Sequence, residues 1–110
     1  MKLPNANKII ISKEKLTDYV LSETHSTGKF KAKFFRKLGF DEINLQIFEN
    51  AIRNLAKSVD VKDKVISQYG TKYVLDGKIN TSFGKVVKIR TIWIIEKGQK
   101  RPRFVTVYPV

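Results

Sequence analysis

The feature that most constrains the fold is a long alternating run near the C-terminus, KVVKIRTIWII at residues 85–95. Successive side chains of a β-strand point to opposite faces of a sheet, so this run predicts one long strand. One face would carry Val87, Ile89, Thr91, Trp93 and Ile95. The other face would carry Val86, Lys88, Arg90, Ile92 and Ile94.

Three further strands are predicted around this run. DKVISQYG at 63–70 and TKYVLDG at 71–77 are separated by Gly70, and the DGK triplet at 76–78 suggests a turn. EKGQKRP at 96–102 predicts a basic loop, and RFVTVY at 103–108 a last strand. In a regular strand, Phe104, Thr106 and Tyr108 would share one side.

The first half of the chain has helical patterns. A short helix is predicted over 13–22, with Ser12 as its N-cap, and a second over 29–38 that ends at Gly39 in a left-handed C-cap. Asp41 can cap a third helix over about 42–57. Its apolar stripe would comprise Ile43, Ile47, Phe48, Ala51, Ile52 and Leu55. We therefore predict an α+β fold, with N-terminal helices packed on one antiparallel sheet of about four strands.

Charge is the strongest compositional signal. The 110 residues include 22 basic and 10 acidic side chains, a net charge of +12. A basic chain of this size predicts a polyanionic partner such as RNA, DNA, a membrane surface or an acidic protein. The length fits a single domain over residues 1–110. No apolar run is long enough to span a membrane, and the lack of cysteine fits a cytoplasmic protein without disulfides or thiolate zinc sites.

The predicted second helix has one unusual position. At about 100° per residue, Lys29, Lys33 and Arg36 fall on a basic face that can contact phosphates. Lys31 instead falls within the apolar arc. Its stem can lie on the core while the ammonium reaches water, or it can point into a cleft and stabilise a scissile phosphate. His25, the only histidine, precedes this helix and is a candidate general acid or base.

The late strands offer partners for such a site. Arg90 and Arg103 are candidates for bidentate phosphate binding, and Thr91 and Thr106 for hydroxyl donation. Tyr73 and Tyr108 are candidates for base stacking, whereas Trp93 is expected in the core. No cluster of histidine and carboxylate residues has metal-ligand spacing, so neither a metal nor another cofactor is predicted.

These blocks resemble a family of small bacterial domains. The carrying motifs are His-x-x-Gly-x-x-Lys-Ala-x-x-Phe from His25 to Phe35, Leu-Gly-Phe at 38–40, and Tyr-Gly-x-x-Tyr from Tyr69 to Tyr73. Thr-x-Trp at 91–93 and the closing Val-Thr-x-Tyr-Pro at 105–109 match as well. The helix motif is similar to motifs in toxin domains of the barnase–EndoU–colicin–RelE group of ribonucleases.

This resemblance implies a metal-independent endoribonuclease that cuts RNA, with tRNA among the candidates, by attack of the 2′-hydroxyl. It implies His25 as acid or base and Lys31 as the phosphate-stabilising residue, with Thr91 and Thr106 as weaker assignments. An acidic antitoxin or immunity protein would be the partner. A chain of this length, without a long N-terminal delivery region, would fit an intracellular toxin.

Two other functions remain open from the sequence. A nucleic-acid-binding module without chemistry would use the same basic face and aromatic residues, and would be insensitive to His25→Ala. A domain that binds only an acidic protein would show no salt-sensitive RNA binding at all.

Overall fold

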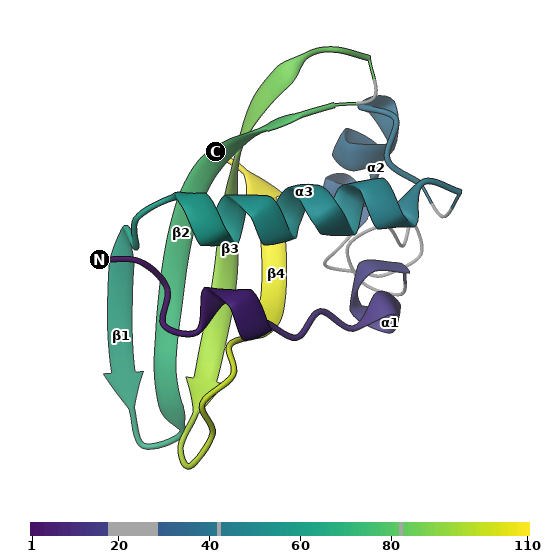
Figure 1. Ribbon diagram of the computed structural model, residues 1–110. Helices are drawn as coiled ribbons and strands as arrows, with labels where there is room; N and C mark the ends of the chain where they lie inside the picture. The colour runs from purple at the N-terminus through teal and green to yellow at the C-terminus, as the bar shows by residue number, and fades with distance from the viewer. Residues whose placement is uncertain (18–28, 42, 82) are drawn as a thin grey trace.

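The computed structural model describes residues 1–17, 29–41, 43–81 and 83–110. Its four strands form one antiparallel sheet in the order β1-β2-β3-β4, and the predicted α+β class is confirmed (Figure 1). The strands are β1 (Asp63–Ser67), β2 (Gly70–Asn80), β3 (Val86–Glu96) and β4 (Arg103–Pro109). The helices are η1 (Ala6–Lys8), α1 (Lys13–Lys15), α2 (Lys29–Lys37) and α3 (Leu45–Ser58).

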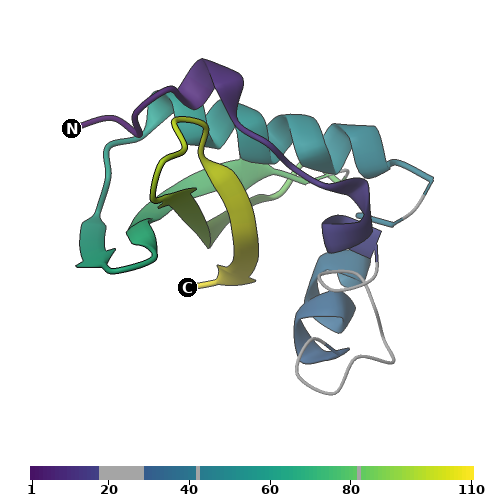
Figure 2. The same cartoon turned by 90° about the horizontal axis from the view of Figure 1, so that it is seen from below.

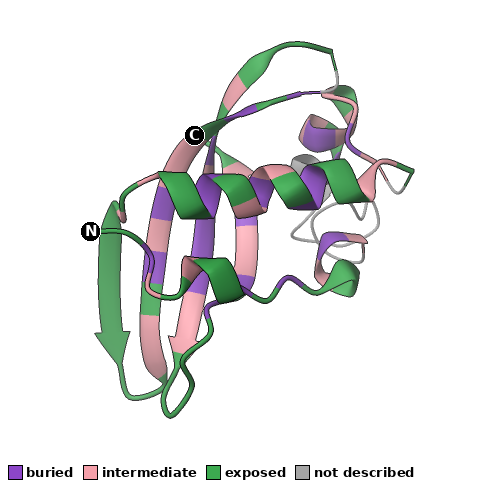
Figure 3. Cartoon of the chain, viewed as in Figure 1, coloured by how far each residue is buried: buried purple, intermediate pink, exposed green. Residues whose placement is uncertain are grey.

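The alternating run forms β3 as predicted. Ile89, Thr91 and Trp93 are buried beneath α3, while Val87 and Ile95 pack at the edge of the core. The burial stripes along β2 in Figure 3 follow this two-residue period, whereas on β3 Ile92 is buried together with its neighbours Thr91 and Trp93. β3 is therefore one of the two inner strands of the sheet, paired with β2 on one side and β4 on the other.

The turn predicted at 76–78 is wrong. β2 runs straight through Asp76, Gly77 and Lys78 and turns only after Asn80. Gly77 serves another purpose, since an added Cβ there would lie 2.9 Å from Cγ of Leu55 on α3. Glycine thus allows the helix to approach the strand backbone closely.

The face assignment of the last strand is partly wrong. The register between β3 and β4 shifts between Ile92 and Trp93, where Trp93 pairs with Phe104 but Ile92 pairs with Thr106. This β-bulge leaves one residue of β4 unpaired and changes the phase of the strand. Phe104 consequently faces the core, whereas Thr106 and Tyr108 lie on the opposite face.

The predicted end of the second helix is confirmed. Gly39 has a φ of 92°, its N–H donates to the carbonyl of Arg36 at 3.0 Å, and Phe40 N–H donates to the carbonyl of Phe35 at 3.0 Å. This pair of bonds is a Schellman motif. It brings Phe40 back beside Phe35, and both side chains are fully buried.

The third helix begins later than predicted. Asp41 Oδ1 accepts bonds from the N–H groups of Ile43 and Asn44, but it caps a turn and α3 itself starts at Leu45. Ile43 is 96% exposed and Ile47 58% exposed, so neither belongs to the buried stripe. The buried face of α3 consists of Phe48, Glu49, Ile52, Leu55 and Ala56.

The predicted first helix is only partly described. Ser12 is its N-cap, since its hydroxyl accepts from Lys15 N–H at 3.4 Å. The rest of the prediction, beyond residue 17, lies outside the described residues.

The N-terminal ten residues connect the two edges of the sheet. Lys2 forms a bridge with Asp60, just before β1. Ile10 pairs with Arg103 at the start of β4, through bonds of 2.9 Å to Pro102 and Phe104. The segment therefore lies beside α3 and satisfies part of the β4 edge (Figure 1).

Candidate functional site

α3 and η1 cover one face of the sheet, and no described helix crosses the opposite face (Figure 2). α2 lies on the β4 side of the molecule and packs on α3 through the tilted contact of Phe35 with Phe48, centroids 5.1 Å apart. We refer to the sheet face away from α3 as the open face. It is the surface on which several predicted site residues meet.

Strand register places the side chains of the open face in rows, because residues directly opposite on antiparallel strands point to the same side. Asp76, Arg90 and Tyr108 form the central row across β2, β3 and β4. Neighbouring rows are Val74–Ile92–Thr106, Lys72–Ile94–Arg103 and Lys78–Lys88. Basic side chains therefore outnumber acidic ones on this face.

The central row is organised by an ion pair. Arg90 Nε donates to Asp76 Oδ1 at 2.7 Å, and an Arg90 Nη donates to Asp76 Oδ2 at 2.9 Å. Lys62 Nζ lies 3.7 Å from the same carboxylate. The hydrogen bond from Arg90 lowers the pKa of Asp76, which therefore stays ionised, and the pair with Asp76, followed by Tyr108, raises the pKa of Arg90.

Tyr108 and Thr106 lie half-buried on the open face. Arg103 is on the same face but stands two rows from Arg90, and its Nε donates to Glu96 Oε1 at 2.8 Å. Arg90, Thr106 and Tyr108 are thus brought together, while Arg103 lies toward the other end of the sheet.

Thr91 needs a correction. Its side chain is fully buried on the helix face, where the hydroxyl donates to the carbonyl of Leu75 at 3.1 Å. The same oxygen accepts from Trp93 Nε1 at 2.9 Å. Both hydrogen-bonding functions are used inside the core, and the side chain lies on the opposite face from Thr106. Thr91 is a structural residue, unable to donate to a phosphate from this position.

Tyr73 also needs a correction, because it is only 7% exposed and belongs to the core beneath α3. A stacking platform requires an open ring face, which this burial excludes. Trp93 is fully buried and packs edge-on against Phe104, centroids 5.5 Å apart. The expectation that Trp93 is a core residue is confirmed.

The predicted residues of the helical half are only partly described. Lys33 is exposed and Arg36 half-buried on α2, with Ala32 and Phe35 buried on its other side. His25 lies outside the described residues, as do the side chains of Lys29 and Lys31. The arrangement of His25 and Lys31 relative to the open face therefore stays a prediction.

Sequence reasoning missed Asp76, because the Asp-Gly pair was interpreted as a turn. The signal that identifies it is the alternation of Tyr73, Leu75 and Ile79, which continues through Gly77. Once the hairpin turn is placed at 81–85, Asp76 falls opposite Arg90.

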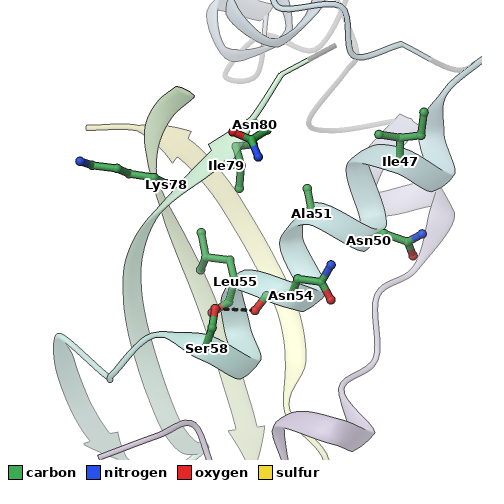
Figure 4. A pocket seen from close by; sticks show the side chains of 9 residues that line it. All are labelled: Ile47, Asn50, Ala51, Asn54, Leu55, Ser58, Lys78, Ile79 and Asn80. Atoms are coloured by element: carbon green, nitrogen blue, oxygen red, sulfur yellow. Dashed lines mark hydrogen bonds between the residues drawn. The ribbon is translucent and has the colours of Figure 1, made fainter. Parts of the chain in front are cut away.

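A second hollow lies between α3 and the far end of β2 (Figure 4). It is a groove of about 410 Å³, with Asn50 and Asn54 on one wall and Ile79 and Asn80 on the other. Among the described residues that line it, Lys78 alone is charged, and its side chain points away from the groove. This hollow offers no group suited to proton transfer or phosphate binding, so the open face remains the better candidate.

Comparison with known proteins places the chain in a family. Residues 2–110 match the family described as a domain of unknown function, DUF6883, and the chain belongs to that family. No curated protein matches it.

The fold is shared with a chain of a solved structure, described as a contact-dependent growth inhibition toxin–immunity protein complex from Klebsiella pneumoniae 342. The TM-score is 0.73 at 19% sequence identity, over 92% of this chain and 99% of that chain. At this identity the similarity establishes the fold alone. Among the described residues, no helix has the length and apolar character that a membrane crossing needs.

Proposed function

We propose that this member of the DUF6883 family is a toxin-type endoribonuclease that cleaves RNA without a metal ion. The observation that carries the proposal is the open basic face, on which Arg90 is held in one row with Tyr108 and beside Thr106. Support for the toxin type comes from the fold shared with a chain of the toxin–immunity complex.

The reaction would use the RNA's own 2′-hydroxyl as nucleophile. His25 would accept its proton as the oxygen attacks the adjacent phosphorus. The bond from phosphorus to the 5′-oxygen of the next nucleotide would break, and the protonated His25 would return the proton through water to that leaving oxygen. Arg90 and Lys31 would stabilise the charge on the phosphorane, and Thr106 would orient the phosphate. The products are a 2′,3′-cyclic phosphate and a free 5′-hydroxyl.

Substrate binding would use further basic side chains. Lys33 and Arg36 on α2, together with Lys29, would contact neighbouring phosphates, and Tyr108 would contact a base. Arg103, at the far end of the face, would lie along the path of the RNA. tRNA is one candidate among the RNA substrates.

We also propose an acidic immunity protein or antitoxin as the physiological partner. The net charge of +12 would steer such a partner onto the basic surface, and a contact on the open face would block RNA access. The solved structure that shares the fold is itself a toxin–immunity protein complex.

The test is cleavage of total bacterial RNA by the purified protein in EDTA, beside His25→Ala and a control, Lys100→Ala, at an exposed residue of the loop between β3 and β4. We expect cleavage by the wild type and by the control, cyclic phosphate ends, and loss of cleavage in His25→Ala. If neither wild type nor His25→Ala cuts, but both bind RNA with the same steep salt dependence, the chain is a binding module instead.

A further inference from the structure

Asp76 is the least exposed charged group of the open face, with only 10% of its side chain accessible. We propose that Asp76 is a positioning residue that holds the Arg90 guanidinium in place to bind a phosphate of the RNA ligand. This inference deepens the proposed function, on which its choice of ligand rests.

The geometry of the pair fixes the guanidinium in one plane. Two parallel bonds, at 2.7 and 2.9 Å, engage Nε and one Nη of Arg90. Fork-to-fork pairing of this kind determines the orientation of an arginine as well as its distance. A guanidinium has five N–H donors; Asp76 takes two and Tyr108 also hydrogen-bonds the group, so at most two remain for a phosphate. A phosphate that approaches the remaining donors would bind a guanidinium that is already ordered, which lowers the entropic cost of binding the phosphate.

The surrounding charges keep the row attractive to anions despite the carboxylate. Lys62 contacts Asp76 at 3.7 Å, and both Lys62 and Lys88 lower the pKa of its carboxyl group. Three cations, Arg90, Lys62 and Lys88, therefore surround one anion. Arg90 is still 29% exposed on its side chain, so a ligand on the open face can reach it.

A purely structural role for Asp76 makes a different prediction for RNA cleavage. If the pair were only a cross-strand salt bridge, Asp76→Asn would remove one negative charge from a basic face and simply strengthen RNA binding. If Asp76 positions Arg90, the same variant should lose the ordered contact of Arg90 with the phosphate and cleave RNA more slowly, while the other basic side chains of the face keep its overall RNA affinity equal or higher. The separation of KM from kcat therefore distinguishes positioning from charge alone.

Asp63 supplies a matched control. It lies opposite Val74 on exposed β1, and register places it on the open face away from Arg90. Asp63→Asn makes the same change in net charge without touching the pair. Arg90→Lys is a further test variant, because it keeps the positive charge and a strand-compatible residue but removes the guanidinium that bonds Asp76 through two N–H groups.

The first measurement is RNA cleavage by the wild type and the three variants, each shown to be folded by thermal melting. We expect kcat to fall by about tenfold or more in Asp76→Asn and Arg90→Lys, with KM unchanged or lower, and kcat to be unchanged in Asp63→Asn. Equal kcat in Asp76→Asn and Asp63→Asn would overturn the positioning role.

The second measurement does not depend on cleavage. The Arg90 Nε–H resonance is followed by NMR while inorganic phosphate, and then a short uncleavable 2′-deoxy oligonucleotide, is added. We expect it to shift in the wild type and in Asp63→Asn, but not in Asp76→Asn. A shift without any RNA cleavage would refute the ribonuclease proposal and leave this site standing. No shift in the wild type would overturn the site itself.

Discussion

Thr91→Val tests whether this residue supports the core or the chemistry. The substitution keeps the shape of the side chain but removes the hydroxyl that bonds Leu75 and Trp93. The indole N–H of Trp93 is fully buried, and it would lose its acceptor with no water to replace it. An unsatisfied buried donor costs about 1–3 kcal/mol, so we expect a loss near 2 kcal/mol. For a chain of this length, that lowers Tm by about 10 °C.

The assay is urea unfolding followed by the fluorescence of Trp93, the only tryptophan of the chain. Thr91→Ser keeps the hydroxyl and should recover most of the hydrogen-bond contribution. Thr106→Val makes the same chemical change on the open face, where the residue is half-buried, and should cost less stability. RNA cleavage per folded molecule should persist in Thr91→Val. A fully stable Thr91→Val protein that has lost cleavage would refute the structural role argued for Thr91.

Three further predictions concern the scaffold. Gly77→Ala should destabilise by about 1–3 kcal/mol in chemical denaturation, because its Cβ would meet Leu55 and Val59, and this cost should shrink in a Leu55→Ala background, where only the Val59 contact remains. The pKa of Asp76 is lowered on folding, so its contribution to stability is complete above about pH 4 and is lost as pH falls further; acid unfolding of Asp76→Asn should lack that component. Ser12→Ala removes the hydroxyl that accepts from Lys15 N–H and should cost about 0.5–2 kcal/mol in thermal melting.

Periodicity predicted the parts of the fold that depend on local pattern. The two-residue alternation of 85–95 and the glycine after α2 identify the central strand and a helix end without tertiary information. The prediction of a turn at 76–78 was wrong because the sequence of an Asp-Gly pair alone does not distinguish between two local structures. It favours a turn, but it also suits a strand on which a helix packs closely, and only the position of Leu55 decides between them.

Only part of the arrangement of the candidate site could be predicted from the sequence. Arg90, Thr106 and Tyr108 do share a face, although the sequence reasoning placed Phe104 with them. The bulge explains the difference, because one unpaired residue in β4 reverses the sheet face to which all later side chains of the strand point. The amino-acid composition of the strand gives no sign of such a bulge. Thr91 was misassigned because a strand threonine has the same pattern whether its hydroxyl faces ligand or core.

The sheet is a meander, and every strand pairs with its neighbour in sequence. Its contacts close short loops, whereas the N-terminal segment joins Lys2 to Asp60 across about half of the chain and Ile10 to Arg103 across most of it. Closing a loop of that length has a large entropic cost and is therefore slow. We expect the strands to pair first and the N-terminal segment to dock last. In folding kinetics, mutations in the β2–β3 hairpin should slow refolding, while mutations at Ile10 should mainly accelerate unfolding.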